Sequence, residues 1–118
     1  MNSLNNLINN HEIEDVIALI INLLSNALTH SDETNRELAN DLLDSAITYT
    51  KYRMDFATHD TKWKSDNDHY RTSAHNRFMD CLNIFLRYNK RPTIEKYDRK
   101  DLGDIACYLA YAAAISER

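Results

Sequence analysis

The sequence predicts an all-α fold, a compact bundle of about four helices in a single domain over residues 1–118. The chain contains one glycine and one proline. Phosphate-binding loops and many β turns need glycine where the backbone adopts positive φ or closely approaches a ligand, and Gly103 alone cannot supply them. Apolar residues also recur at intervals of three and four, as on the buried face of a helix. A chain of this length buries about two-thirds of its unfolded surface, enough for one hydrophobic core.

The first predicted helix runs from about Glu12 to Thr29. Its apolar residues lie on more than one face, which is typical of a helix at the centre of a bundle. The longest apolar stretch, Val16 to Leu24, is too short to span a bilayer, so no membrane association is expected. Residues 1–11 are rich in asparagine, a poor helix former, and we expect a short turn or a loosely ordered arm there.

The second predicted helix runs from about Glu33 to Thr58, with Ser31 or Asp32 as its N-cap. Its apolar residues recur at helical spacing. They include Leu38, Leu42, Ala46, Tyr49 and Phe56. One long helix that continues across residues 58–66 is an open alternative to a break between this helix and the next.

The third predicted helix begins near Asp66 or Asp68 and ends at about residue 91, ahead of the proline. Its apolar stripe consists of Tyr70, Ala74, Phe78, Cys81, Leu82, Phe85 and Tyr88. A short linker follows, and a fourth helix begins at Asp98 or Asp101. Its alanine-rich second half allows a neighbouring helix to approach closely.

The formal net charge of −4 is divided unevenly along the chain. Residues 1–50 contain eight acidic residues and one basic residue, whereas residues 51–100 contain twelve basic and seven acidic residues. The middle of the chain is therefore the part that attracts anions. A sequence pI near 5.7 falls well short of the basic character expected of a nucleic-acid-binding domain, so nucleic acid is not expected as a partner.

The two cysteines, Cys81 and Cys107, lie far apart and outside any CxxC pair. This spacing indicates neither a zinc site nor a disulfide framework, and a reducing cytoplasm is the expected location. No metal site and no cofactor are predicted.

Three polar residues interrupt the apolar stripes of the two middle helices. On a projection of about 100° per residue, Arg71 and His75 fall within the stripe of the third helix, and Arg53 falls within that of the second. We expect these helices to form an antiparallel hairpin with its turn near residues 60–65. Arg53 then lies level with Arg71, and Tyr49 lies level with His75.

Two arginines in one pocket need a negative charge beside them, because burying like charges without a counter-charge costs several kcal/mol. That charge comes either from Asp55, Asp60 or Asp104, or from a bound phosphate or carboxylate. Tyrosines near the arginines would stack on a base or donate their hydroxyls, which suits a nucleotide-like ligand. The candidate ligand-binding residues are Tyr49, Tyr52, Arg53, Tyr70, Arg71 and His75.

An enzymatic alternative uses part of the same cluster. Arg71 and His75, followed by Asn76, resemble the Arg-and-His motif of HEPN-type helical ribonucleases. The resemblance implies that Arg71 and His75 are catalytic, with dimerisation pairing two such motifs. In the non-enzymatic reading, no residue is catalytic.

A second resemblance covers the chain from Leu38 to Arg118. The matching features are Tyr49 and Arg53, the segment Tyr70-Arg71-Thr72-Ser73-Ala74-His75-Asn76, Leu82-Asn83, and Arg99 to Ala106. In this order they are similar to an uncharacterised family of small all-helical proteins from bacteria and their phages. The resemblance supports the helical fold and marks Arg71 and His75 without assigning them a ligand.

Together these features predict a non-enzymatic helical binding protein, homo-oligomeric and encoded by a phage or mobile element. Its expected role is to counter host defence, either by sequestering an anionic nucleotide-like signalling molecule or by blocking a host protein. A HEPN-like ribonuclease or toxin is the enzymatic alternative. A purely structural interaction module is the third possibility.

Overall fold

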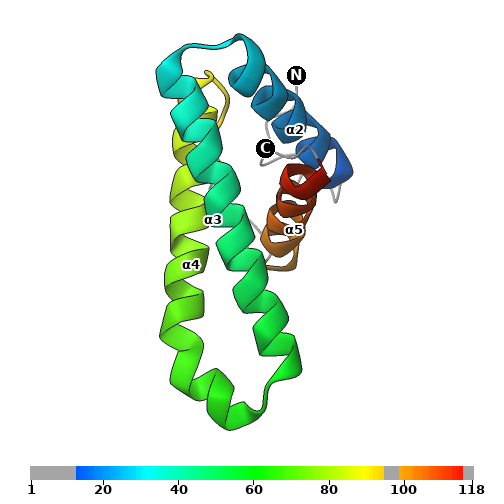
Figure 1. Ribbon diagram of the computed structural model, residues 1–118, viewed down its shortest axis with the longest axis vertical. Helices are drawn as coiled ribbons and strands as arrows, with labels where there is room; N and C mark the ends of the chain where they lie inside the picture. The colour runs from blue at the N-terminus through cyan, green and yellow to red at the C-terminus, as the bar shows by residue number, and fades with distance from the viewer. Residues whose placement is uncertain (1–12, 95–98, 116–118) are drawn as a thin grey trace.

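A computed structural model describes residues 13–94 and 99–115 (Figure 1). These residues form four α-helices and no strand: α2 (Ile13–His30), α3 (Glu33–Thr58), α4 (Thr61–Tyr88) and α5 (Arg99–Ile115). The predicted all-α class and the number of helices are confirmed within these ranges. The arm predicted over residues 1–11 lies outside the described residues.

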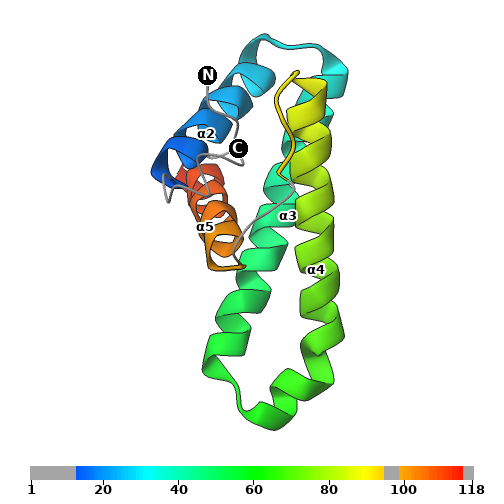
Figure 2. The same ribbon diagram turned by 180° about the vertical axis from the view of Figure 1, so that it is seen from behind.

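The two long helices α3 and α4 form an antiparallel hairpin, and α2 and α5 pack against each other and against α3 (Figures 1 and 2). The part of the hairpin nearest its turn extends beyond α2 and α5 (Figure 1). The molecule is elongated along the hairpin, with principal extents of 45 × 32 × 22 Å. One end of the hairpin is thus covered by other helices, whereas the end at the turn is not.

The hydrophobic core is formed by residues of all four helices and by Ile94. Its largest fully buried side chains are Tyr49, Phe78, Phe85, Ile20, Leu42, Leu82, Leu86, Ile94, Leu102, Ile105 and Leu109. Most of these positions belong to the apolar stripes of the helices, because residues three or four apart share one face of a helix, whereas Ile94 comes from the segment after α4. Burying each of these large apolar side chains contributes about 1.5–3 kcal/mol.

The turn of the hairpin consists of His59 and Asp60. His59 has an extended backbone (φ −105°, ψ 164°), which ends α3. The Asp60 carboxylate then accepts a hydrogen bond of 2.9 Å from the Trp63 N–H and caps α4. The prediction that this helix begins near residue 66 or 68 was therefore wrong, and no continuous helix crosses residues 58–66.

The opposite end of the hairpin, here called the Asn35 end, is held by four polar side chains: Asp32, Asn35, Tyr88 and Asn89. The amides of Asn35 and Asn89 donate to each other's oxygens at 2.9 and 3.0 Å. The Tyr88 hydroxyl donates to the Asp32 carboxylate at 2.8 Å. These hydrogen bonds join the start of α3 to the end of α4.

Asp32 is also the N-cap of α3, as one of the two predicted candidates. Its carboxylate accepts a hydrogen bond of 2.7 Å from the Asn35 backbone N–H. This bond, followed by the one from Tyr88, lowers the pKa of Asp32. The same contact with Asp32 raises the pKa of Tyr88, because the hydroxyl must keep its proton to donate it.

The C-terminus of α4 forms a Schellman motif. Lys90 adopts the left-handed conformation (φ 60°) that a glycine usually provides. The Lys90 N–H donates to the Arg87 carbonyl at 3.0 Å, and the Arg91 N–H donates to the Leu86 carbonyl at 2.8 Å. The chain thereby reverses direction immediately after α4.

The segment that leaves α4 is then held against it by Asn83. The Asn83 side chain accepts a hydrogen bond of 2.9 Å from the Ile94 N–H and donates one of 3.2 Å to the Ile94 carbonyl. Ile94 itself is 1% exposed and belongs to the core. The side chain of Asn83 therefore directs the chain back along the hairpin toward α5.

Helix α2 is, within the described residues, the one helix long and apolar enough to cross a membrane, judged by length and composition. In the structure, Val16 and Ile20 on its inner face are fully buried against the other helices. The compact globule is compatible with a soluble protein. A cytoplasmic location and the lack of membrane association remain predictions.

Candidate functional site

Tyr49 of α3 occupies the centre of the candidate site and is only 2% exposed. Its ring stacks on Phe78 with a centroid distance of 6.0 Å and meets the His75 ring edge-on at 5.5 Å. The predicted register, with Tyr49 level with His75, is therefore confirmed. The Tyr49 ring is packed in the core and contacts His75 at its edge.

Arg53 lies one helical turn beyond Tyr49, toward the hairpin turn. Its guanidinium carbon is 6.0 Å from the centroid of the Tyr49 ring, and the group lies directly against Gly103 of α5. Arg53 is half-buried. It forms no ion pair with any residue that the structure describes.

Arg71 of α4 is also half-buried, with its guanidinium carbon 5.0 Å from the centroid of the Phe56 ring. One nitrogen, Nη2, donates to the Asp68 carboxylate at 3.0 Å. The side chain of Asp68 is 58% exposed, so this ion pair is largely hydrated and weak. The Nε of Arg71 is buried without a hydrogen-bond partner in the structure.

The two arginines lie at the same level of the hairpin but contact different neighbours. Tyr49 faces His75, and one turn nearer the hairpin turn the corresponding residues are Arg53 on α3 and Arg71 on α4. Arg53 contacts α5, whereas Arg71 contacts the ring of Phe56. The common level is as predicted from the helical projection, whereas Gly103 and Phe56 were not foreseen as their neighbours.

None of the three aspartates proposed as counter-ions forms an ion pair with either arginine. Asp60 caps α4, and Asp104 pairs with Lys100 at 3.1 Å. Asp55 also forms no ion pair within the described ranges. The acid that does contact Arg71 is Asp68, which the helical projection missed although its spacing of three residues is typical of an ion pair on one helix.

His75 lies one turn from Arg71 on the same face of α4 and is half-buried. Its Nδ1 is 3.1 Å from the Asn76 side-chain oxygen. The ring is thus oriented by Asn76 at one nitrogen and by the edge contact with Tyr49. This arrangement holds the imidazole one helical turn from the level of Arg53 and Arg71.

Two of the predicted tyrosines lie beside the cluster, one on each helix of the hairpin. Tyr52 and Tyr70 stack with a centroid distance of 6.5 Å and an interplanar angle of 11°. Tyr70 is 51% exposed, and Tyr52 is half-buried. Of the three tyrosines predicted to bind a ligand, Tyr70 is therefore the most exposed residue, and the His69 ring lies against its ring with a centroid distance of 3.9 Å.

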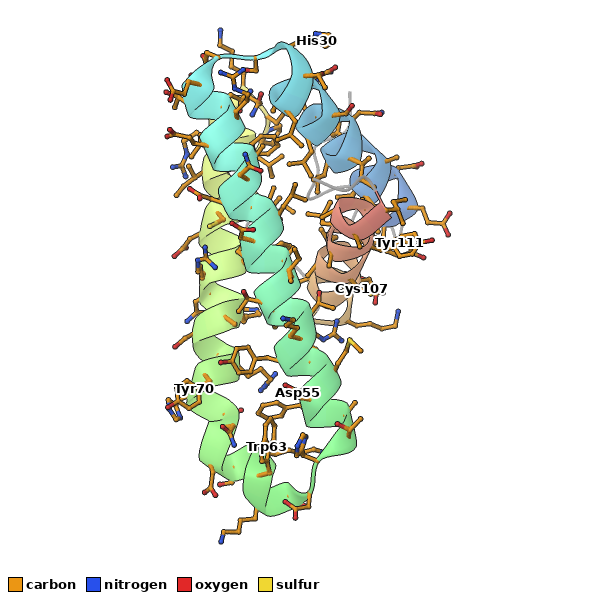
Figure 3. All side chains as sticks on the ribbon, in the orientation of Figure 1. His30, Asp55, Trp63, Tyr70, Cys107 and Tyr111 are labelled. Atoms are coloured by element: carbon orange, nitrogen blue, oxygen red, sulfur yellow. The ribbon has the colours of Figure 1, made fainter. Side chains whose placement is uncertain are left out.

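Aromatic side chains also fill the space between the helices close to the turn, where Figure 3 shows Trp63. Trp63 stacks on His59 at 3.9 Å and meets Phe56 edge-on at 5.2 Å. The Arg71 guanidinium in turn lies over the Phe56 ring. Phe56, His59 and Trp63 thus form a row of aromatic rings from Arg71 to the hairpin turn.

A separate cavity of about 470 Å³ lies between α2, α3 and α5. Among the described residues its lining is mostly aliphatic and uncharged: Ile21, Leu24, Ser25, Leu28, Thr29, Leu43, Ala112, Ala113 and Ile115. The Thr29 hydroxyl is already bonded to the Ser25 carbonyl at 2.7 Å. The described lining offers an anion no cation, so Arg53 and Arg71 are the better candidates for an anion site.

Metal-binding geometry is absent from the described part of the chain, where no three His, Cys, Asp or Glu residues come close enough to share an ion. Cys81 and Cys107 are both free thiols, the first half-buried and the second exposed. No protein-family model, no curated protein and no solved structure matches this chain.

Proposed function

We propose that this protein is a non-enzymatic binding protein that captures an anionic, nucleotide-like ligand at Arg53, Arg71 and His75. One observation carries the proposal: two half-buried guanidinium groups lie at one level of the hairpin with unused donors. Arg53 has no ion pair within the described residues, and the buried Nε of Arg71 has no hydrogen-bond partner.

The unused buried donor of Arg71 raises the free energy of the protein without a ligand. A buried donor without a partner costs about 1–3 kcal/mol, and a guanidinium group costs more because it is charged. A phosphate or carboxylate supplies both the acceptor atoms and the counter-charge, and arginine binds such groups in a bidentate geometry. Ligand binding would therefore relieve a cost that the free protein carries.

The aromatic surroundings favour a nucleotide over a simple anion. Tyr70 is exposed beside the two arginines, and its ring contacts those of Tyr52 and His69. A nucleobase presents a flat π surface to such a ring, and stacking of this kind contributes about 1–3 kcal/mol per base. The phosphate would then contact the arginines, with His75 as a further donor.

The proposed biological setting comes from the resemblance of residues 38–118 to small helical proteins of bacteria and their phages. On that basis, the protein acts in the cytoplasm as a homo-oligomer, encoded by a phage or mobile element, and counters host defence by sequestering a signalling nucleotide. Blocking of a host protein through an outer helix face is the alternative within the same class.

Isothermal titration calorimetry with ATP, cyclic dinucleotides and inorganic phosphate tests the site. We expect binding of at least one phosphorylated nucleotide, and a roughly tenfold to hundredfold loss of affinity in Arg53→Ala and in Arg71→Ala, since each removes a charge-assisted hydrogen bond. Arg77→Ala is the matched control, because Arg77 is an exposed arginine on the same helix as Arg71. Absence of binding, or equal affinity in all three variants, would overturn the proposal.

The ribonuclease alternative rests on the placement of Arg71 and His75 one turn apart on α4, with both side chains half-buried. A histidine in that position can exchange a proton with a phosphodiester. Incubation with RNA distinguishes the two functions: cleavage that is lost in His75→Ala supports the enzyme. Intact RNA together with nucleotide binding supports the binding protein.

A further inference from the structure

We infer that Gly103 is a positioning residue of the proposed anion site and that α5 forms the wall that holds Arg53 in place. This inference rests on the proposed function for its biological meaning, whereas its structural part can be tested without any ligand. Its basis is the close contact between the Arg53 guanidinium on α3 and the backbone of α5 at Gly103.

The backbone conformation does not explain why residue 103 is a glycine. No described glycine has positive φ, so an L-amino acid would fit the helical backbone at this position without strain. Glycine is also the least favourable residue in a helix interior apart from proline. The reason for its presence must therefore lie in the space around it.

That space is occupied by Arg53. A Cβ atom built on Gly103 overlaps Nη1 and the guanidinium carbon of Arg53 and lies 2.8 Å from its Nε. Outside the neighbouring residues and backbone of α5, the three atoms nearest to that position all belong to Arg53. The Arg53 guanidinium thus occupies the space that a side chain at residue 103 would fill.

The contact restricts a side chain that is otherwise flexible. Arg53 is held by the Tyr49 ring on its own helix and by the surface of α5 at Gly103. A charged group that is already ordered in the free protein loses less conformational entropy when it binds an anion. Gly103 would therefore increase affinity without contacting the ligand itself.

The same geometry separates binding from folding. The atoms that a Cβ would meet are the far end of a long side chain, so Gly103→Ala displaces the guanidinium and leaves the helix backbone in place. The fold is expected to persist, whereas Arg53 is expected to leave its position. The methyl group of Gly103→Ala thus tests whether the position of the Arg53 guanidinium matters for binding.

The ligand-free part of the test uses NMR of the Arg Nε–Hε signals in Gly103→Ala, assigned with Arg53→Ala. We expect the Arg53 signal to shift in Gly103→Ala while the backbone spectrum stays folded. Cys107→Ala, an exposed small residue one turn further along α5, is the matched control and should leave the signal unchanged. An Arg53 signal that is unaffected by Gly103→Ala would overturn the inference.

Thermal unfolding provides a second readout, because alanine favours a helix more than glycine does. In the Arg53→Ala background, Gly103→Ala is expected to raise the Tm, since the space is then empty. In the wild-type background the same change is expected to raise it less or to lower it. Equal shifts in both backgrounds would show that Arg53 and Gly103 are not coupled.

Titration with ATP then connects the contact to binding. If ATP binds, Gly103→Ala is expected to lose at least threefold in affinity, and the double variant is expected to bind as Arg53→Ala alone does. Additive losses, or full affinity in Gly103→Ala, would overturn the positioning role. If neither ATP nor any other nucleotide binds the wild type, the proposed function fails, while the NMR and thermal comparisons still decide the contact.

Discussion

The two ends of the α3–α4 hairpin use polar side chains in opposite ways. At the Asn35 end, Asn35 and Asn89 satisfy each other's amides, and Tyr88 bonds to Asp32. Toward the turn, Arg53 has no ion pair within the described residues, and Arg71 has a buried nitrogen without a partner. Polar groups that complete one another stabilise the fold, whereas unused charged donors are suited to binding a ligand.

The difference follows from what covers each end. The Asn35 end joins the start of α3 to the end of α4, while the half of the hairpin nearest the turn extends beyond α2 and α5 (Figures 1 and 2). The amide of Asn35, which is 5% exposed, must find its partners inside the protein, because a buried unpaired group costs about 1–3 kcal/mol, whereas Asp32 and Tyr88 at the same end are exposed. A half-buried arginine near an uncovered surface can instead take its partner from solution.

The largest effect is expected from Tyr49, which lies in the core between the two ends. Tyr49→Ala should lower the free energy of unfolding by about 3–5 kcal/mol, because it leaves a cavity among Phe78 and its neighbours. Urea unfolding followed by circular dichroism measures this loss. Tyr70→Ala is the control and should cost less than about 1 kcal/mol, since Tyr70 is 51% exposed. Equal losses in both variants would contradict the assignment of Tyr49 to the core.

The contrast between the ends can be tested directly with one substitution at each. Asn89→Ala should destabilise the protein by about 1–3 kcal/mol, because it removes two hydrogen bonds from the buried amide of Asn35 and leaves only the bond to the Ser31 hydroxyl. Arg71→Ala should change stability by less than about 1 kcal/mol, because its ion pair with Asp68 is exposed to solvent. Urea titrations of both variants measure the difference. A loss in Arg71→Ala as large as that in Asn89→Ala would show that the arginine has a structural role.

A smaller, pH-dependent effect is expected from the bond between Asp32 and Tyr88. Folding lowers the pKa of Asp32 below its ordinary value of 3.8, mainly through the Asn35 N–H and then through Tyr88. The folded state therefore binds the proton less tightly, so this stabilisation is present above about pH 4 and disappears as the pH falls through the lowered pKa. Thermal unfolding from pH 6 to pH 2 should show a steeper loss of Tm in the wild type than in Asp32→Asn. Parallel curves would rule out this contribution.

Tyr88 responds at the other end of the pH scale. Folding raises its pKa above the ordinary value of 10.0, so its contribution is complete below that value and is lost as the pH rises through the raised pKa. Tyr88→Phe should remove both the acidic and the alkaline response that depend on this bond. If the Tm of Tyr88→Phe fell with acid as steeply as that of the wild type, the bond from Tyr88 would not contribute to the lowered pKa of Asp32.

The smallest expected effect concerns the backbone after the Asn35 end. Lys90 has φ 60°, a conformation in which a non-glycine residue is strained, so Lys90→Gly should stabilise the protein by about 0.5–1 kcal/mol. Lys51→Gly, at an exposed position in the interior of α3, should instead destabilise it by about 1 kcal/mol. The two midpoints of urea unfolding should therefore move in opposite directions. Loss of stability in both variants would show that the lysine side chain contributes more than the strain costs.

The limits of the sequence prediction are clearest at the hairpin turn. The second helix, Glu33–Thr58, was predicted with the bounds that the structure has. The start of α4 was missed because residues 61–69 are mostly polar and show no apolar stripe, since they lie beyond the helices that cover the rest of the hairpin (Figure 1). The capping residue Asp60 was the local signal that could have placed the start correctly.

The sequence by itself determined the helical class, the antiparallel hairpin and the common level of Arg53 and Arg71. These features depend on the spacing of apolar residues within each helix and on the near absence of glycine and proline, and both can be read from the sequence directly. Only the tertiary structure decided what those arginines contact. Gly103 lies far along the chain from Arg53, and Asn35 bonds to a residue 54 positions away, so no local pattern encodes either pair. Gly103, the one glycine of the chain, leaves the space that the Arg53 guanidinium occupies after folding.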